Sequence, residues 1–252
     1  MPNKKILKAI LSYGDRYRKE MLDSRYIKQQ LIDSWWESLK FFFGRAFFQG
    51  RRDDISEKVY NTAVELLEPK LRNWSRNFEK RDLVLLKKDL LGQIGKGRVG
   101  KARDVEMVIS TLQYINRLPN LNIVAYTVQC INKGEISQHY EELQRAKNET
   151  GIVQVGTKIA SFYLRDVVSL FNLENKVSDD FQFCLQPVDV WVRRLAKKIG
   201  MAPDNATDSQ IRQEIVRVCK ENHCSPLRFN QGAWYAGYFA FDLLIENLLT
   251  EK

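Results

Sequence analysis

Apolar residues recur every three or four positions through most of this chain, which is the spacing that gathers side chains on one face of an α-helix. The clearest stripe contains Ile27, Leu31, Trp35, Leu39 and Phe43, and others follow over 59–67, 108–115 and 211–218. The alternation of apolar and polar residues that marks a β-strand is essentially missing from the sequence. The run Leu83–Leu86 is short enough for a strand, but its neighbours fit a helix better. We therefore predict an all-α fold.

The distribution of breaks along the chain fits one folded unit with two lobes. Breaks that contain glycine, proline or asparagine separate roughly ten predicted helices, and no long linker or internal repeat intervenes. The breaks lie near 50–54, 92–100, 119–120, 150–156, 178–187 and 202–207. We expect residues 30–150 to form one lobe and residues 1–29 with 151–252 to form the other.

The charge of the chain is compatible with a polyanionic partner. Its 40 lysines and arginines outnumber 31 acidic residues, which gives a net charge of +9. Nucleic-acid binding fits this balance, although basic proteins of other kinds share it. The four cysteines, at positions 130, 184, 219 and 224, have no framework spacing, which indicates a reducing compartment. Because the apolar runs are only a few residues long, we expect no segment to cross a membrane.

A glycine-rich stretch, Gly95–Ala102, matches the dinucleotide pattern G-x-G-x-x-G and nearly matches the phosphate-binding pattern G-x-x-x-x-G-K-[ST]. However, Ala102 replaces the hydroxyl that would bind magnesium, and no parallel-sheet pattern or downstream acidic residue accompanies the stretch. We interpret Lys96, Arg98 and Lys101 instead as a basic loop that contacts DNA phosphates, with a merely solvated loop as the alternative.

A second basic turn follows Gly50. Arg51 and Arg52 stand directly after this glycine, downstream of phenylalanines that fit a protein core. Arginines in such a turn could contact a phosphate backbone, and a solvated turn explains them equally well.

Two charged residues stand at the starts of predicted helices, where the helix dipole tunes ionisation. Lys158 follows Gly156, and both the dipole and partial burial disfavour its protonated form. A neutral amine is the nucleophile that attack on a sugar C1′ requires, and the product is a Schiff base. Asp189 lies just inside a helix begun by Pro187, where its carboxylate is favoured and could stabilise an oxocarbenium-like centre. From spacing alone, a surface lysine and an ordinary helix-start aspartate are the simpler interpretation.

The segments around both residues resemble the signature of the helix-hairpin-helix DNA glycosylases. In that superfamily the hairpin binds the DNA backbone through main-chain amides, and a lysine and an aspartate carry out the chemistry. The matching residues here are Lys158 and Asp189. The hairpin pattern L-P-G-V-G-x-K is similar to Ile152–Lys158, which lacks the proline and the first glycine. Within a hairpin at 150–158, the resemblance implies DNA contacts from Gln154, Val155, Gly156 and Thr157.

Within this superfamily the chain looks most like the archaeal 8-oxoguanine glycosylases. The four cysteines of the iron–sulphur members are absent after Asp189, and the spacer between Lys158 and Asp189 is long. In addition, Gly50–Asp54 is similar to a turn of that branch, and Ser225–Gly237 is similar to the entry of its C-terminal helix.

The same resemblance implies a base pocket. Trp234 matches a pocket tryptophan that could stack on an extruded base. Asn230 stands where the branch has an aspartate, Ser56 where it has another tryptophan, and Arg25 where it has a glutamine. Oxidised guanine differs from guanine at C8 and by a proton on N7. A hydrogen-bond acceptor such as the amide oxygen of Asn230 could therefore discriminate between the two bases.

The resemblance implies an all-α helix-hairpin-helix glycosylase whose two helical lobes flank a cleft. Such an enzyme flips a damaged base out of double-stranded DNA, cuts its glycosidic bond through Lys158 with help from Asp189, and then breaks the strand by β-elimination. We expect 8-oxoguanine as the base. Another damaged base, such as an oxidised pyrimidine, and a non-catalytic helix-hairpin-helix DNA-binding protein are the alternatives. No metal or organic cofactor is implied, and we expect a cytoplasmic, nucleoid-associated monomer without membrane contact.

Overall fold

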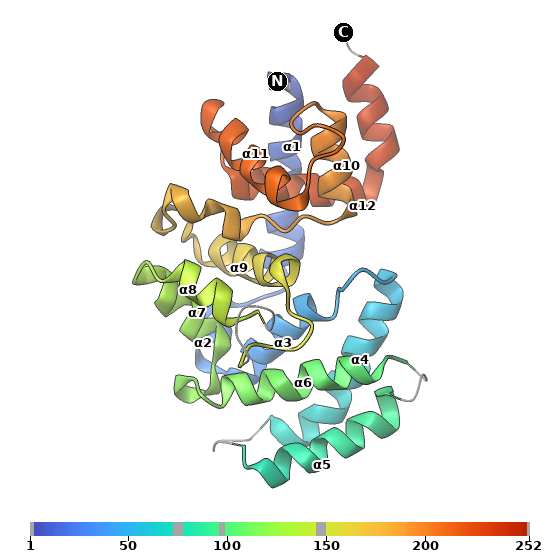
Figure 1. Cartoon of the computed structure of the whole chain (residues 1–252), viewed down its shortest axis with the longest axis vertical. Helices are drawn as coiled ribbons and strands as arrows, with labels where there is room; N and C mark the ends of the chain where they lie inside the picture. The colour runs from blue at the N-terminus through green and yellow to red at the C-terminus, as the bar shows by residue number, and fades with distance from the viewer. Residues whose placement is uncertain (1–2, 73–77, 96–98, 145–149, 251–252) are drawn as a thin grey trace. The chain divides into compact units, whose positions relative to one another are not determined.

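The computed structural model is helical throughout the residues that it describes, which are 3–72, 78–95, 99–144 and 150–250 (Figure 1). Across these ranges there is no β-strand, and the β-type pairing is limited to isolated bridges such as that between Gln144 and Ile152, so the prediction of an all-α chain is confirmed. The α-helices are α1 (Lys4–Tyr17), α2 (Lys28–Asp33), α3 (Trp35–Ala46), α4 (Asp53–Leu71), α5 (Lys80–Leu90), α6 (Ala102–Ile115), α7 (Ile123–Asn132), α8 (Ile136–Glu142), α9 (Thr157–Phe171), α10 (Val190–Lys198), α11 (Asp208–Glu221) and α12 (Pro226–Thr250). Short π and 3₁₀ helices are η1 (Arg18–Asp23), η2 (Leu91–Gly95), η3 (Pro119–Leu121), η4 (Glu174–Lys176) and η5 (Asp179–Leu185).

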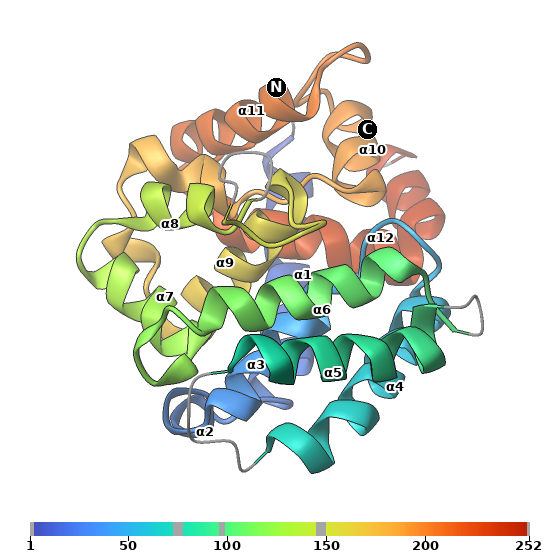
Figure 2. The same cartoon turned by 60° about the horizontal axis from the view of Figure 1, so that its bottom comes forward.

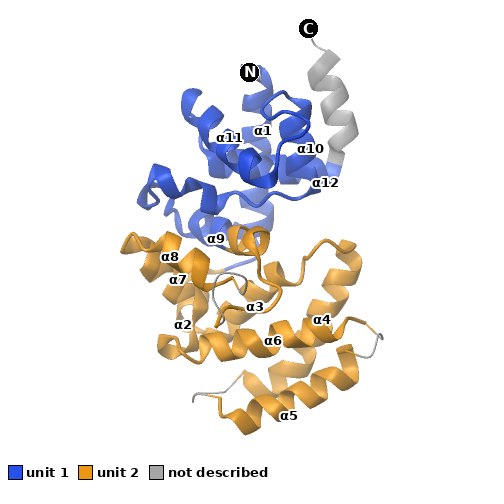
Figure 3. Ribbon diagram, viewed as in Figure 1, with its two compact units in different colours: residues 1–26, 164–252 blue, residues 27–163 orange. Residues whose placement is uncertain are grey.

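The chain divides into two compact units (Figure 3). Unit 1 consists of residues 1–26 and 164–252, and unit 2 consists of residues 27–163. The sequence predicted that the N-terminal segment joins the C-terminal part, and unit 1 has this composition. The second boundary differs from the expected one, because the segment 151–163 belongs to unit 2 and the division falls inside α9.

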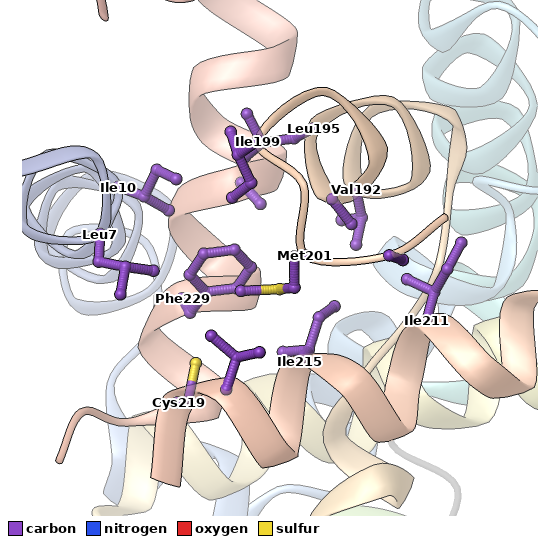
Figure 4. Packing of buried hydrophobic residues seen from close by; sticks show 14 of the residues in the cluster. Leu7, Ile10, Val192, Leu195, Ile199, Met201, Ile211, Ile215, Cys219 and Phe229 are labelled. Atoms are coloured by element: carbon purple, nitrogen blue, oxygen red, sulfur yellow. The ribbon is translucent and has the colours of Figure 1, made fainter. Parts of the chain in front are cut away.

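An apolar cluster fills the centre of unit 1 (Figure 4). Phe229 of α12 lies beside Met201, and α1 and α11 contribute Ile10 and Ile215. Phe229, Ile10 and Ile215 have no exposed surface. Burying one large apolar side chain stabilises a fold by about 1.5–3 kcal/mol. The cluster therefore explains why helices from both ends of the sequence form one unit.

Two glycines bring the backbones of α1 and α12 into direct contact. A Cβ atom on Gly232 would lie 1.9 Å from the carbonyl oxygen of Ile10, and one on Gly14 would lie 2.2 Å from that of Arg228. Both distances are far inside van der Waals contact, so only glycine fits at either position.

Unit 2 is built on the aromatic side chains of α3. Phe41, Phe42 and Phe43 have no exposed surface, and Phe42 packs edge-to-face on Tyr163 with ring centroids 5.0 Å apart. Ser34 caps the helix by accepting a hydrogen bond from the main-chain N–H of Glu37. Elsewhere in the unit, α5 and α6 lie side by side, as Figures 1 and 2 show.

A buried polar cluster also lies inside unit 2. The Thr127 hydroxyl is 2.8 Å from His139 Nε2 and 2.8 Å from the Tyr163 hydroxyl, and the Tyr114 hydroxyl is 3.3 Å from His139 Nδ1. Burial lowers the pKa of His139, although the neighbouring Glu142 acts in the opposite direction. The imidazole is therefore neutral in the folded protein near pH 7.

Across the described ranges, no helix combines the length and the apolar composition needed to cross a membrane.

Candidate active site

The segment that leads into α9 is a tight turn with one left-handed residue. Gln154 has a φ of 65°, a conformation that residues other than glycine adopt uncommonly. It stands where the helix-hairpin-helix pattern has its first glycine, a residue that adopts this conformation freely. Ile152 and Val155 are buried on either side, and the Val155 N–H donates to the Ile152 carbonyl oxygen at 3.1 Å. The local backbone thus has the handedness that the missing glycine would favour.

Lys158 is the second residue of α9 and its side chain is half-buried. Its Nζ lies 3.5 Å from the carbonyl oxygen of Phe48, a long hydrogen bond. Within the described part of the chain it forms no ion pair with a carboxylate. In this part of the chain the charge of the Lys158 amine is therefore not offset by a carboxylate partner.

A bidentate ion pair fixes the turn that carries Phe48. Arg51 donates to both carboxylate oxygens of Asp104 at 2.9 Å, and Asp104 is 3% exposed. Arg51 also donates to the Ser56 hydroxyl at 3.3 Å and to a main-chain carbonyl oxygen at 3.2 Å. Every nitrogen of this guanidinium thus has a partner inside unit 2. These bonds give Arg51 a scaffolding role within unit 2, while its contact with DNA stays a prediction.

Asp189 lies in unit 1 and is the N-cap residue of α10. Its Oδ1 accepts a hydrogen bond of 2.8 Å from the main-chain N–H of Val192. The predicted helix start at Pro187 is wrong, because α10 begins at Val190 and the preceding residues are not helical. The aspartate side chain explains this start, since it supplies the acceptor that the first turn of a helix lacks. The partly exposed carboxylate stands at the positive end of the helix dipole.

A hydrogen-bonded chain of buried residues ends two positions before Asp189. Arg165 Nε donates to Asp166 Oδ1 at 3.0 Å, and the Tyr17 hydroxyl donates to Asp166 Oδ2 at 2.8 Å. Arg165 also donates to the amide oxygen of Asn230 at 2.9 Å. The amide nitrogen of Asn230 in turn donates to the carbonyl oxygen of Pro187 at 3.1 Å. The chain therefore connects α1, α9 and α12 of unit 1 to the segment that carries the candidate aspartate.

The charge of Arg165 acts on Asp189 as well. Burial on its own would lower the pKa of Arg165, but Tyr17, Asp166 and Asp189 more than offset this effect and the pKa is raised. The guanidinium therefore stays charged inside unit 1, and its charge attracts the carboxylate of Asp189.

The four residues expected in a base pocket have different environments. Trp234 is partly buried and stacks on Tyr238, with ring centroids 5.2 Å apart and an interplanar angle of 8°. Asn230 has no exposed surface. Arg25 is exposed and donates to a main-chain carbonyl oxygen at 3.2 Å. These residues belong to unit 1, whereas the wholly buried Ser56 belongs to unit 2.

The residues expected to contact DNA are exposed to different degrees. Thr157 is exposed, Gly156 has open space around the position of a side chain, and Val155 and Gln154 belong to the turn described above. Arg52 is exposed and pairs with the exposed Asp54, while Lys101 is exposed at the N-cap of α6. Two further predicted contacts lie outside the described residues: Lys96 and Arg98.

A surface pocket of about 590 Å³ in unit 1 contains none of the predicted site residues. Its rim carries charges that are already paired, such as Lys220 with Asp179 and Arg228 with Asp15. In the portions of the chain described here, no three His, Cys, Asp or Glu side chains are grouped so that they could hold a metal ion.

The two candidate catalytic residues belong to different units, Lys158 to unit 2 and Asp189 to unit 1. Their juxtaposition stays a prediction. Comparisons of the chain with family models, curated proteins and solved structures give no match, so the geometry within each unit is the basis for a function.

Arg165 and Asp166, the centre of the buried hydrogen-bonded chain in unit 1, are not among the site residues predicted from the sequence. A signal was present, because these two charges interrupt the otherwise apolar and small residues of Ile159–Leu170. Charged residues are rarely buried in a protein core unless they are paired. Here Arg165 pairs with its sequence neighbour Asp166, and Tyr17 bonds to the same guanidinium.

Proposed function

We propose that this protein is a bifunctional DNA glycosylase and AP lyase of base excision repair that removes an oxidised base, 8-oxoguanine, from duplex DNA. The observation that carries the proposal is the turn before α9. Gln154 has the left-handed conformation of a helix-hairpin-helix glycine, and Lys158 follows on the first turn of the helix, where no carboxylate of the described residues pairs with its amine.

The proposed reaction uses the amine of Lys158 as the nucleophile. Nζ attacks C1′ of the damaged nucleotide, the glycosidic bond breaks, and its electron pair leaves with the base, which takes up a proton. Loss of the amine proton and opening of the sugar ring give a Schiff base. Removal of a C2′ proton then expels the 3′ phosphate by β-elimination. Asp189 stabilises the positive charge that develops at C1′ while the base departs.

The same elements support DNA binding and base stacking. The first N–H groups of α9 have no acceptor within the helix and are suited to a phosphate oxygen. Trp234 and Tyr238 offer aromatic faces that could stack on an extruded base. Phosphate contacts of this kind weaken steeply as salt concentration rises.

Borohydride trapping tests the proposal, because borohydride reduces a Schiff base to a stable amine. We expect the protein to form a covalent adduct with duplexes that carry an abasic site or 8-oxoguanine. Lys158→Gln should abolish the adduct, whereas the matched control Lys133→Gln, at an exposed position of unit 2, should retain it. An adduct that persists in Lys158→Gln would show that another amine is the nucleophile.

The alternatives are outcomes of the same experiment. Binding to duplex DNA without any adduct would indicate a non-catalytic helix-hairpin-helix protein and would end the enzymatic proposal. Faster cleavage of thymine-glycol duplexes than of 8-oxoguanine duplexes would assign the enzyme to oxidised pyrimidines.

A further inference from the structure

We infer that Asn230 is a positioning residue for Asp189 and does not read the damaged base. The inference rests on the proposed function, since it concerns the residue that assists base departure. It differs from the pocket role that the resemblance implied for Asn230, because both polar groups of this buried side chain are already engaged within unit 1.

Both polar ends of the Asn230 amide are occupied. Its oxygen accepts from Arg165 at 2.9 Å and its nitrogen donates to the Pro187 carbonyl oxygen at 3.1 Å. The residue has no exposed surface, so a base could reach the amide only if these buried bonds were broken. Breaking the bond to Asn230 would remove one acceptor from the buried Arg165 guanidinium, and a buried charged donor that loses an acceptor is unfavourable. Hydrogen bonds to a damaged base would have to compensate for that loss, so the Asn230 amide is poorly suited to recognise a base.

The bond to Pro187 acts on Asp189 through a short and well-packed stretch of main chain. Pro187 is buried and Val188, the only residue between them, is 2% exposed within the apolar cluster of unit 1. With one end of this stretch fixed by Asn230 and the other by the cap on Val192, the carboxylate has little freedom to move.

Arg165 makes the orientation of the Asn230 amide unambiguous. Its guanidinium is a donor only, so it requires the amide oxygen on its side and leaves the N–H₂ group to face Pro187. The guanidinium is itself held by Asp166 and by the Tyr17 hydroxyl, both of them buried. The same group also attracts the carboxylate of Asp189.

A positioning role and a reading role predict different specificities. If Asn230 reads the base, a change at this position alters the rate for 8-oxoguanine relative to other lesions. If it positions Asp189, the change slows excision of every base by the same factor, since the carboxylate acts on the sugar and not on the base.

The test uses Asn230→Asp in the full-length protein. The carboxylate keeps an acceptor for Arg165 but loses the donor to Pro187 and sets an oxygen against its carbonyl. We expect excision of 8-oxoguanine and of thymine glycol in single-turnover experiments to fall by the same factor, on the order of 10-fold to 10²-fold, with substrate affinity retained. Asp189→Asn, which keeps a capping side chain but removes the charge, sets the upper limit of the effect. Gln231→Glu is the matched control, because it places a carboxylate at the adjacent buried position of α12.

Hydrogen exchange gives a readout that does not depend on activity. The Val192 amide, which donates to Asp189, should exchange faster in Asn230→Asp than in the wild type or in Gln231→Glu. If Asn230→Asp does not fold, Arg165→Lys gives the same readouts, since one amine keeps the charge but cannot replace the fork of the guanidinium.

Two results would overturn the inference: unchanged exchange at Val192, or a change in the rate for one lesion relative to the other. Failure of the proposed function is a separate result. In that case the wild type itself shows neither excision nor trapping, while exchange at Val192 still reports whether Asn230 holds Asp189.

Discussion

The contact between α1 and α12 leads to a stringent prediction, because the backbones can approach this closely only while Gly232 has no side chain. In Gly232→Ala the new Cβ would lie 1.9 Å from the Ile10 carbonyl oxygen and 2.8 Å from the Gly14 nitrogen. Ordinary contact begins near 3.4 Å, so the two backbones must separate by about 1.5 Å at this point. Neither atom belongs to a flexible side chain that could turn away.

The size of the effect follows from that separation. A gap of about 0.5–1 Å already removes a quarter to a half of the dispersion attraction between packed atoms, and Ile6, Leu7 and Ile10 of α1 are all buried. Overpacking of this kind typically costs about 1–3 kcal/mol. Alanine offsets about 1 kcal/mol because it favours the helix. Since two rigid backbones collide here, the cost lies at the upper end of this range, and after the offset we expect Gly232→Ala to lower the free energy of unfolding by about 2 kcal/mol.

Urea unfolding followed by circular dichroism measures this change, and hydrogen exchange in α1 assigns it to unit 1 if the two units unfold separately. Gly92→Ala is the control, because no atom lies within 4 Å of its Cβ position. We expect it to change stability by no more than about 1 kcal/mol, in the stabilising direction. A Gly232→Ala protein within about 0.5 kcal/mol of the wild type would refute the packing argument.

Two further predictions concern charged groups of unit 2. Arg51→Ala should lower the free energy of unfolding by about 3 kcal/mol, because it leaves the buried Asp104 without its ion-pair partner. Arg52→Ala, whose partner Asp54 is exposed, should change it by less than about 0.5 kcal/mol; equal effects in urea unfolding would contradict the assignment of Arg51 to the scaffold. Burial lowers the pKa of His139 in the folded state. As the pH falls, the unfolded chain therefore takes up a proton on this residue before the folded chain does. The contribution of neutral His139 to stability is thus present above its ordinary pKa of 6.5 and is lost as the pH falls below that value. Urea unfolding between about pH 7.5 and about pH 5 should therefore show a smaller loss of stability in His139→Gln than in the wild type, and identical slopes would rule out this contribution.

Much of the fold could be predicted because it depends on local patterns. The stripe that begins at Ile211 lies in α11, and Thr207 caps this helix, with its side chain accepting from the main-chain N–H of Gln210. The run Leu83–Leu86 lies inside α5, as its neighbours indicated. Helical periodicity and capping involve residues a few positions apart, so one sequence contains the whole signal.

The candidate site was less predictable, because its contacts join residues distant in sequence. Asn230 and Arg165 are separated by 65 positions, and Arg51 and Asp104 by 53. The helical periodicity of a sequence contains no information on contacts between residues so far apart. The resemblance supplied roles for individual residues but not their partners. It therefore could not reveal that Arg51 and Asn230 have their polar groups engaged within the protein.

Unit 1 consists of two segments that are separated in the sequence by the whole of unit 2, and this arrangement affects how the chain folds during synthesis. Residues 1–26 are synthesised before unit 2, yet the rest of unit 1, which covers the apolar face of α1, follows only after residue 163. Unit 2 is continuous in sequence and can fold before α12 is available to pack against α1. The ion pair between Asp15 and Arg228, for example, joins residues that are 213 positions apart. Contacts over so long a separation form late, so a nascent chain carries α1 as an exposed amphipathic helix until α12 has been synthesised. A chaperone that binds exposed amphipathic helices should therefore contact α1 during synthesis and release it once α12 packs against it.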